Sequence, residues 1–273
     1  MAHSERVTLI TACYQSAAVI RTALESVLAQ KGVDLDYLVI DGGSTDGTVD
    51  IVREFEPKFA GRMRWLSEKD AGMYDAINKG IRMAQGEFVG ILNADDVLAA
   101  DDVLSRVVAA FDADPALDGT YADIRFVTDS ASAPCVRHTE LRALPTVRYC
   151  SGRHFRPWQF RFGVQTAHPS TFFRRSCFDR WGLYSLDYGM YSDFDLLCRF
   201  IWRNRARMRY LPLCTTVMRT GGASTDGWRT TIRINRADRR ALRANGCWTC
   251  YPLLYARYLF KIWGFVFRTR GRA

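Results

Sequence analysis

The sequence has no long apolar run. Its 273 residues contain no window that is apolar for long enough, without charge, to span a bilayer. Residues 1–12 also lack the charged start, long apolar centre and small-residue cleavage site of a signal peptide. We therefore expect a cytoplasmic location.

The eight cysteines show no spacing that indicates a metal or disulfide framework. They are scattered through segments expected to be core or element ends: Cys13, Cys135, Cys150, Cys177, Cys198, Cys214, Cys247 and Cys250. The last two form a lone C-x-x-C with no second Cys or His pair near it, which argues against a zinc or redox site. Free, mostly buried thiols are expected.

Acidic residues are nearly absent from the C-terminal end. Residues 229–273 hold eleven Lys and Arg and a single acid, Asp238, whereas the whole chain has a net charge of +9. Aromatic residues alternate with these cations: Trp248, Tyr251, Tyr255, Tyr258, Phe260, Trp263, Phe265 and Phe267. This composition is typical of a segment lying in a membrane interface over anionic lipid, and Arg257 and Lys261 argue against a span. An amphipathic helix packed on the rest of the chain is the alternative. No nucleic-acid-binding motif accompanies the charge, so we expect no nucleic-acid partner.

A glycine-rich phosphate loop is missing after the first predicted strand, where residues 12–16 read Ala-Cys-Tyr-Gln-Ser. Without G-x-G-x-x-G at this point, a dinucleotide-dependent oxidoreductase is disfavoured. A sugar nucleotidyltransferase is disfavoured for the same reason.

The sequence does contain a regular alternation of strands and amphipathic helices. Strands are predicted at residues 7–14, 37–40, 63–66 and 88–92. The helices between them carry apolar stripes, the first formed by Ile20, Ala23, Leu24, Val27 and Leu28. A further helix near residues 102–111 and a strand over 119–127 follow. This order predicts an α/β fold with a mostly parallel central sheet flanked by helices.

Carboxylates follow three successive strands, at Asp41, Asp70 and the pair Asp95 and Asp96. In open α/β sheets, ligands bind beyond the carboxyl ends of the strands, and oxygen ligands of this kind suit Mg²⁺ or Mn²⁺. Each also has a structural alternative, because Asp is common in turns and at helix starts. For Asp46, which precedes Gly and Thr, we favour that structural role.

Three motifs together resemble family 2 glycosyltransferases of the GT-A fold, of the kind found in bacterial polysaccharide biosynthesis. The motifs lie at residues 39–48 (VIDGGSTDGT), 67–80 (SEKDAGMYDAINKG) and 92–96 (LNADD). The resemblance implies a nucleotide-sugar donor, with uridine as the default base, a Mg²⁺ or Mn²⁺ ion, and inversion at the anomeric carbon. It places the nucleotide-sugar half at about residues 1–127 and the acceptor half at about 128–228, with the tail at 229–273.

The resemblance also suggests donor-site roles for individual residues. Asp41 would contact the base, Asp70 the base or ribose, and Lys79 belongs to the same donor motif. Asp95 would face the ribose or the metal, and Asp96 would hold the metal. Family members often carry Asp-x-Asp where this chain has Asn93-Ala94-Asp95, so which of Asp95 and Asp96 dominates metal binding stays open.

The second half is less periodic. Residues 128–165 show no clear period and indicate a functional loop or an undetected element. Residues 166–173 resemble the strand entering the acceptor half. His168 lies at its start and is a weak candidate for acceptor contact, although a lone His in an apolar strand is more often structural.

Residues 191–200 predict a helix in which geometry separates two acids. Asp193 shares the inward face with Leu196 and Leu197. Asp195 is rotated by about 200° from Asp193 and can form a surface ion pair with Arg199. In the family, the position of Asp193 is the catalytic base, commonly preceded by Glu; here Ser192 stands in that place.

Residues 220–225 resemble a Gly-Gly-x-Ser loop, with Arg219 before it and Arg229 after it. Backbone amides and an Arg beside a departing diphosphate would stabilise its charge, and a flexible turn is the equal alternative.

From all these motifs together, we expect an inverting glycosyltransferase on the inner face of the plasma membrane, acting on a glycan or polyprenyl-linked acceptor. The rival of another class is a non-catalytic, membrane-associated nucleotide-sugar-binding subunit.

Overall fold

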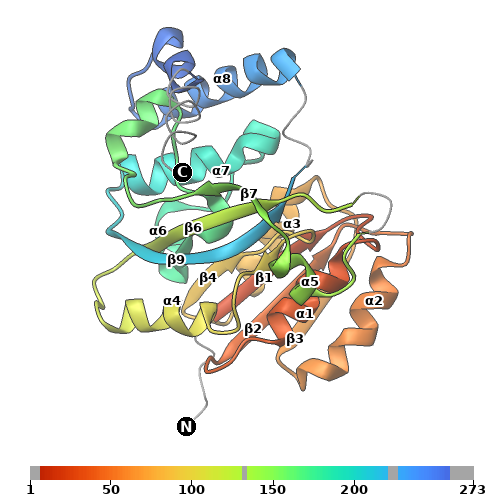
Figure 1. Ribbon diagram of the computed structural model, residues 1–273. Coiled ribbons are helices and arrows are strands. Elements are labelled where there is room, and N and C mark those ends of the chain that lie inside the picture. Colours follow the sequence, from red (N-terminus) through yellow and green to blue (C-terminus); the bar gives the residue numbers. More distant parts are fainter. Residues whose placement is uncertain (1–6, 131–133, 221–226, 259–273) are drawn as a thin grey trace, which may run out of the picture.

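The computed structural model describes residues 7–130, 134–220 and 227–258 (Figure 1). A curved sheet runs through the described chain. Its strands are β1 (Val7–Cys13), β2 (Leu35–Asp41), β3 (Met63–Ser67), β4 (Phe88–Ile91), β5 (Val97–Leu98), β6 (Gly119–Val127), β7 (Thr146–Cys150), β8 (Phe172–Arg174) and β9 (Met208–Arg219). The α-helices are α1 (Ile20–Leu28), α2 (Thr48–Phe55), α3 (Met73–Met83), α4 (Val103–Asp112), α5 (His138–Ala143), α6 (Arg175–Trp181), α7 (Ser192–Leu197) and α8 (Gly227–Ala244).

The first four strands form the parallel half of the sheet, as predicted. Their order is β3-β2-β1-β4, and β1 pairs in parallel with both β2 and β4. The ends of each of these four predicted strands lie within two residues of the observed ends. The crossover helices α1, α2 and α3 return the chain to the same edge, so the C-terminal ends of all four strands lie together.

The other half of the sheet is mixed. Strand β8 runs antiparallel to β4 and β6, whereas β9 is parallel to β6 and antiparallel to β5. The predicted strand at 166–173 is shorter than expected, because His168–Ser170 forms a 3₁₀ turn before β8.

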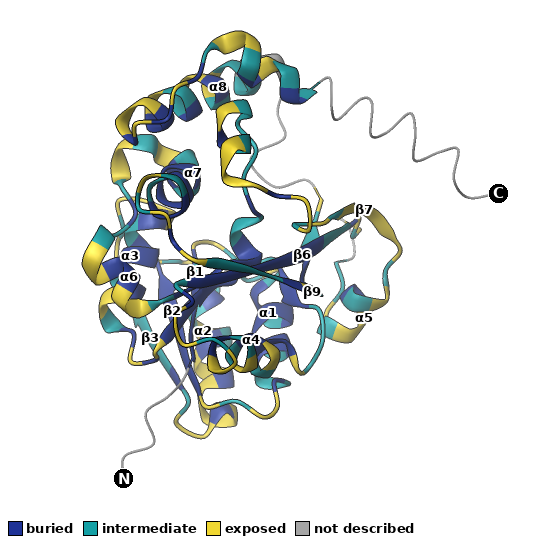
Figure 2. Cartoon of the chain, turned by 90° about the vertical axis from the view of Figure 1, so that its left-hand side faces the viewer, coloured by how far each residue is buried: buried dark blue, intermediate teal, exposed yellow. Residues whose placement is uncertain are grey.

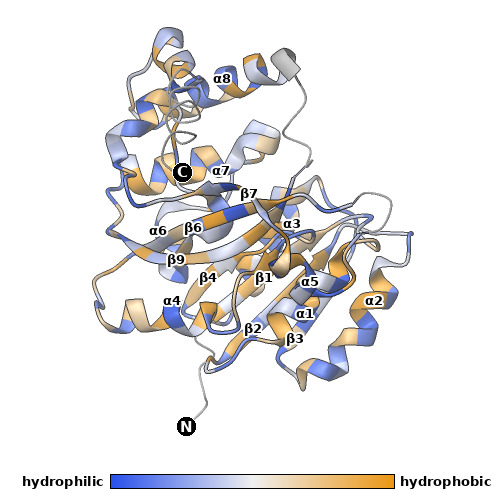
Figure 3. Ribbon diagram, viewed as in Figure 1, coloured by the Kyte–Doolittle hydropathy of each residue, from blue (hydrophilic) through white to orange (hydrophobic). Residues whose placement is uncertain are grey.

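Helices cover both faces of the sheet (Figure 2). One apolar core joins Leu9, Tyr37 and Phe88 to α1, α2 and α4, and a second joins Ile10, Leu38 and Val89 to α3, α6 and α7. Neighbouring residues of one strand thus enter different cores, because side chains alternate across a strand. The central strands are buried on both faces and consist mostly of apolar residues (Figure 3).

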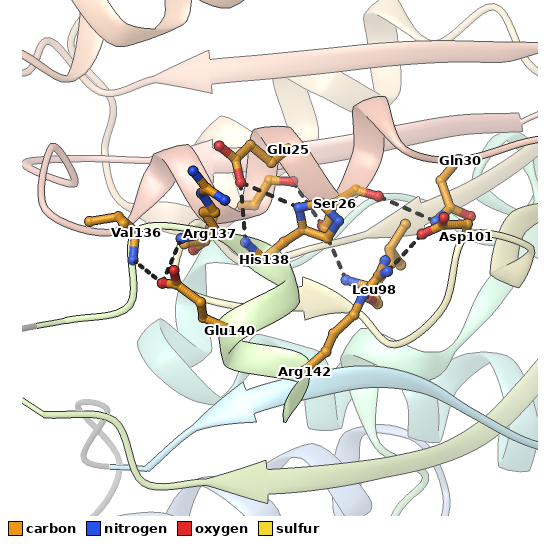
Figure 4. A network of polar contacts seen from close by, with 12 residues as sticks. Glu25, Ser26, Gln30, Leu98, Asp101, Val136, Arg137, His138, Glu140 and Arg142 are labelled. Carbon is orange, nitrogen blue, oxygen red and sulfur yellow. Dashed lines mark hydrogen bonds and ion pairs between the residues drawn. The ribbon is translucent and has the colours of Figure 1, made fainter. Parts of the chain in front are cut away.

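Residues 134–165 form ordered elements, α5 and β7, rather than a plain loop. Helix α5 is tied to α1 and to the chain after β5 (Figure 4): Arg142 donates to the Leu98 carbonyl at 2.7 Å and to Asp101 at 2.6 Å, and the His138 amide donates to Glu25 at 3.2 Å. No clear period is visible in this stretch because α5 is short and four of the five residues of β7 are exposed.

The described part of the C-terminal segment, residues 227–258, packs on the rest of the chain, which was the alternative considered for it. Leu242, Cys247 and Leu254 are buried in the core with α7. Asn245 donates to Asp195 at 2.9 Å, and Thr249 donates to the Arg161 carbonyl at 2.6 Å. Residues 259–273 lie outside the described residues, so the predicted membrane contact there stays a prediction. None of the helices in the described ranges is both long and apolar enough to cross a membrane. All eight cysteines fall in those ranges and are free thiols.

Candidate functional site

A cavity of about 1440 Å³ lies beyond the C-terminal ends of the parallel strands. One wall comes from the residues that follow β1, β2, β3 and β4, and the facing wall comes from α7, α8 and the chain around Gln165. Five carboxylates line it: Asp70, Asp95, Asp96, Asp193 and Asp238. Four basic residues also line it: Lys69, Arg148, Arg219 and Arg257. A cavity lined by both carboxylates and cations suits a ligand that has both anionic groups and hydroxyls.

Asp95 and Asp96 sit where β4 ends, as predicted from the apolar run before them. Asp96 is 1% exposed and accepts a hydrogen bond from the Asn93 side chain at 2.8 Å. Burial and the neighbouring charge of Asp95 raise the pKa of Asp96 well above its usual range. Asp96 does not cap α4, because β5 and a turn lie between them.

The pair fits a divalent cation. Asp96 is buried and Asp95 is partly exposed, and two adjacent carboxylates repel each other unless a positive charge offsets them. Their oxygen atoms match the preference of Mg²⁺ and Mn²⁺. Within the described ranges, no group of three or more His, Cys, Asp or Glu side chains could enclose a metal. This donor set suits an ion that completes its shell with water and substrate phosphates.

Asp70 lines the cavity after β3, whereas Lys79 and Asp41 do not. The Lys79 ammonium pairs with the Asp70 carboxylate and with Glu68, the latter at 2.7 Å, so it holds Asp70 in place. Asp41 is 1% exposed and accepts hydrogen bonds from Ser67 at 2.6 Å and from the Ser44 amide at 2.9 Å. Burial opposes ionisation of Asp41, but these hydrogen bonds lower its pKa overall.

The Asp41 contacts shape the turn after β2, and Gly42 and Gly43 of that turn line the cavity. Direct contact of Asp41 with a base therefore stays a prediction. Asp46 has the structural role favoured for it, because it accepts from the Thr48 amide at the start of α2 at 3.1 Å.

Arg219, at the end of β9, lines the cavity and is 9% exposed at its side chain. Its guanidinium donates to the Asp95 carbonyl at 2.9 Å and to Thr22 at 3.0 Å, and it pairs with Asp129. Arg219 therefore fixes the loop that carries the acidic pair. The predicted Gly-Gly loop lies outside the described residues beyond Thr220.

Asp193 and Asp195 separate as the helical geometry predicted. Asp193 lines the cavity and accepts a hydrogen bond from Gln165 Nε2 at 3.0 Å. Asp195 points away and pairs with Arg199 at 3.5 Å. The expectation of a surface pair was wrong, since Asp195 is 5% exposed and Asn245 covers it. Burial raises the pKa of Asp195, against the Asn245 hydrogen bond and the Arg199 charge.

His168 does not line the cavity and is not in a strand. Its Nε2 lies 2.6 Å from the Tyr184 hydroxyl, and its ring contacts Tyr74 edge-on. Burial lowers the pKa of His168. The geometry is that of a satisfied structural histidine, and the acceptor contact stays a prediction.

Sequence reasoning missed four residues of the facing wall: Arg148, Gln165, Asp238 and Arg257. Arg148 stacks on Phe126, 3.9 Å from its ring centre. Arg257 belongs to the segment predicted to lie on a membrane, yet its side chain is only 9% exposed and pairs with Asp238 at 2.8 Å. The single acid in a basic segment was the one signal that could have indicated this pair.

Comparisons with known proteins agree with this geometry. The family model described as "Glycosyl transferase family 2" matches residues 8–180. A Mycobacterium bovis (strain BCG / Pasteur 1173P2) protein named "PGL/p-HBAD biosynthesis glycosyltransferase" is 31% identical over 195 residues, which are 71% of this chain and 69% of that protein. An uncharacterized glycosyltransferase of Mycobacterium tuberculosis (strain CDC 1551 / Oshkosh) is 30% identical over 201 residues, covering 73% and 70%.

Two solved structures show the same fold. S. aureus TarS 1-349 in complex with UDP has a TM-score of 0.58 at 16% identity, and the match covers 87% of this chain and 65% of TarS. The mannosyltransferase PcManGT from Pyrobaculum calidifontis, in complex with GDP-Man and Mn²⁺, has a TM-score of 0.58 at 19% identity, covering 97% and 81%. The mixed α/β architecture is therefore the expected GT-A fold. The family model matches more than half of this chain, and the sequence relatives are named glycosyltransferases. This chain is therefore a glycosyltransferase and belongs to glycosyl transferase family 2.

Proposed function

We propose that this protein is an inverting glycosyltransferase that moves a sugar from a nucleoside diphosphate to a hydroxyl of a glycan or polyprenyl-linked acceptor. The observation that carries the proposal is that Asp193 lines the same cavity as Asp95 and Asp96. One wall thus offers an acidic pair suited to a metal and a diphosphate. Of the two carboxylates on the facing wall, Asp238 pairs with Arg257, which leaves Asp193 to accept a proton.

Asp193 is the proposed general base. It lies in the first turn of α7, whose apolar residues Leu196 and Leu197 are fully buried and anchor the helix. Gln165 holds one carboxylate oxygen, and Asp193 borders the cavity in which the acceptor hydroxyl is proposed to bind. As the hydroxyl oxygen forms its bond to the anomeric carbon, its proton passes to Asp193 and the bond from that carbon to the diphosphate oxygen breaks. One direct displacement inverts the anomeric centre and needs no covalent enzyme intermediate.

Asp95 and Asp96 are the proposed holders of Mg²⁺ or Mn²⁺, an ion that stabilises negative charge on a leaving diphosphate. Asp70 and the Gly42-Gly43 turn form the wall proposed for the nucleoside. Relatives of the same fold bind UDP, UDP-GlcNAc, or GDP-Man with Mn²⁺. These ligands support a nucleotide-sugar donor, and uridine remains our proposed base.

We also propose that the protein acts at the cytoplasmic face of a membrane. Trp248 is 65% exposed and Tyr255 is 41% exposed, although the segment that carries them is anchored by buried Leu254. Exposed aromatics within a basic segment suit an anionic lipid surface. Binding to vesicles with and without anionic lipid would test this, and equal binding to both would contradict it.

A binding screen tests the donor proposal. Calorimetry would measure UDP, GDP and their sugars, each with Mn²⁺, with Mg²⁺ and with EDTA. We expect one nucleotide to bind in a metal-dependent manner to the wild type and not to Asp96→Ala. Asp102→Ala is the matched control, since Asp102 lies six residues along the chain and outside the cavity.

Three outcomes would count against the proposal. Absence of nucleotide binding under every metal condition would remove the donor site, and unchanged binding by Asp96→Ala would remove the metal role. Tight donor binding without transfer or donor hydrolysis would favour the non-catalytic subunit instead. For an active enzyme, NMR of the first-formed product decides whether the anomeric configuration is inverted.

A further inference from the structure

The wall beside Asp193 contains buried polar atoms that have no partner in the described structure. They are Gln165 Oε1, Asn235 Nδ2 and Arg257 Nε. An unmet buried hydrogen-bonding group costs about 1–3 kcal/mol, and native proteins contain few of them. Two of these side chains, Gln165 and Arg257, line the cavity, and Asn235 is the buried neighbour of Arg257. A ligand bound at this end supplies the missing partners once the two lining side chains turn toward it.

Gln165 has a defined orientation. Its Nε2 donates to Asp193 Oδ2 at 3.0 Å, and an ionised carboxylate can only accept. The amide therefore turns its nitrogen to Asp193 and leaves Oε1 as a free acceptor beside the proposed base. A group that binds there must donate a hydrogen bond, as a hydroxyl does.

The pair of Asp238 and Arg257 continues this wall. Arg257 donates to Asp238 at 2.8 Å, to the Gly163 carbonyl at 2.6 Å and to Asn235 Oδ1 at 2.6 Å. Both residues of the pair line the cavity, although Asp238 is 3% and Arg257 is 8% exposed. Burying an ion pair brings little stability by itself, so a role in recognition accounts for its place better.

The backbone is shaped around this pair. Gly163 has φ +67°, a conformation that favours glycine. A Cβ atom there would overlap the Arg257 guanidinium and approach Asp238 Oδ2 to 3.1 Å. Gly163 lies two residues before Gln165, so one stretch of chain seats the ion pair and presents the free amide oxygen.

We propose that Gln165, Asp238 and Arg257 form a subsite for a sugar acceptor and bind a hydroxyl next to the one that Asp193 deprotonates. A sugar ring carries neighbouring hydroxyls, each able to donate and accept. One hydroxyl donates to Asp193 and its neighbour donates to Gln165 Oε1. Asp238 and Arg257 offer an acceptor and donors to the rest of the ring. This inference rests on the proposed function, because it takes Asp193 as the base.

The test compares two acceptors and three variants. The acceptors are a methyl glycoside with adjacent free hydroxyls and its monodeoxy analogue, supplied with the donor found in the binding screen. Gln165→Met removes the amide and keeps a similar shape. Gln165→Glu keeps an accepting oxygen. Gln85→Met, at an exposed glutamine outside the cavity, is the matched control.

We expect the wild type to have at least a tenfold lower KM for the diol than for the deoxy glycoside. In Gln165→Met this preference disappears, while donor binding stays within a factor of two. Turnover of both glycosides falls as well, because Asp193 loses the hydrogen bond from Gln165 Nε2, so the ratio of the two KM values is the readout. Gln165→Glu keeps the preference but lowers kcat, because a second carboxylate stands beside Asp193. Gln85→Met behaves as the wild type.

Three results would overturn the subsite: a preference that survives in Gln165→Met, a wild type that uses both glycosides equally, or a wild type that transfers only to water or to alcohols with a single hydroxyl. In each of these, donor binding and turnover persist and the proposed function stands. A wild type that neither binds nor hydrolyses any donor refutes the proposed function itself, so the two failures are distinguishable.

Discussion

Replacing Asp193 by Asn should abolish most turnover without unfolding the protein. The variant keeps an oxygen that can accept from Gln165, so only the charge of that 3.0 Å hydrogen bond is lost, at about 1 kcal/mol of stability. The loss of a general base costs about 10²–10⁴-fold in rate, which is about 3–5 kcal/mol of activation free energy. The effect on catalysis should thus exceed the effect on folding several-fold.

Asp195→Asn is the matched control, two residues along the same helix. Asp195 is buried against Asn245 and pairs with Arg199 at 3.5 Å, facing away from the cavity. Removing its charge should cost about 1–3 kcal/mol of stability, because Arg199 keeps its bonds to the Trp181 and Leu183 carbonyls. The folded variant should retain the wild-type kcat.

The assay measures release of nucleoside diphosphate at saturating donor, together with donor binding and urea unfolding of each variant. We expect Asp193→Asn to bind donor normally, to unfold near the wild-type midpoint and to turn over at least a hundredfold more slowly. The assignment of the base is refuted if Asp193→Asn keeps more than a tenth of the wild-type kcat, or if Asp195→Asn loses as much as Asp193→Asn.

Two further predictions concern stability. Burial raises the pKa of Asp238 from 3.8 to about 7, against the attraction of Arg257. Below pH 3.8 the Asp238 carboxyl is protonated in both the folded and the unfolded protein, and between pH 3.8 and about 7 it is protonated only in the folded protein. The free energy of unfolding should therefore fall as pH rises from 3.8 to about 7, and then level off. One proton gives a slope of at most about 1.4 kcal/mol per pH unit; Asp238→Asn should remove that slope, and an unchanged pH profile contradicts the assignment. Gly90→Ala should destabilise the folded protein by about 1–3 kcal/mol, because the added methyl overlaps the buried ring of Phe172. Urea unfolding measures this loss. An unchanged free energy of unfolding would mean that β4 and β8 separate more easily than their packing indicates.

The parallel half of the fold could be predicted because its signals are local. Each strand from β1 to β4 is a short apolar run between polar turns, and each helix between them has a stripe of period near four. In the mixed half, the strand predicted over 119–127 matches β6, but its pairing could not be predicted, since β6 pairs with β9 across about ninety residues. No local period encodes which distant strand is the partner.

The residues of the candidate site also fall into those that local patterns indicate and those whose surroundings depend on distant parts of the chain. Asp70, Asp95 and Asp96 follow strand ends, and Asp193 lies on a helix with a clear apolar face, so local patterns indicated them. All four line one cavity, and their roles stay predictions. Arg257 was misplaced because its partners, Asp238 and the Gly163 carbonyl, lie 19 and 94 residues away. Asp195 was expected at the surface because nothing in its own helix reveals that Asn245 covers it.

The two walls of the cavity have different origins along the chain, and this has an evolutionary consequence. The wall proposed for the donor comes from the ends of the first four strands, within the region that the family model matches. Part of the wall proposed for the acceptor comes from α8 and Arg257, after that region ends. On this proposal, substitutions in residues 227–258 should change acceptor choice while leaving donor chemistry intact. Exchanging residues 227–258 between relatives should transfer the acceptor preference of one protein to the other.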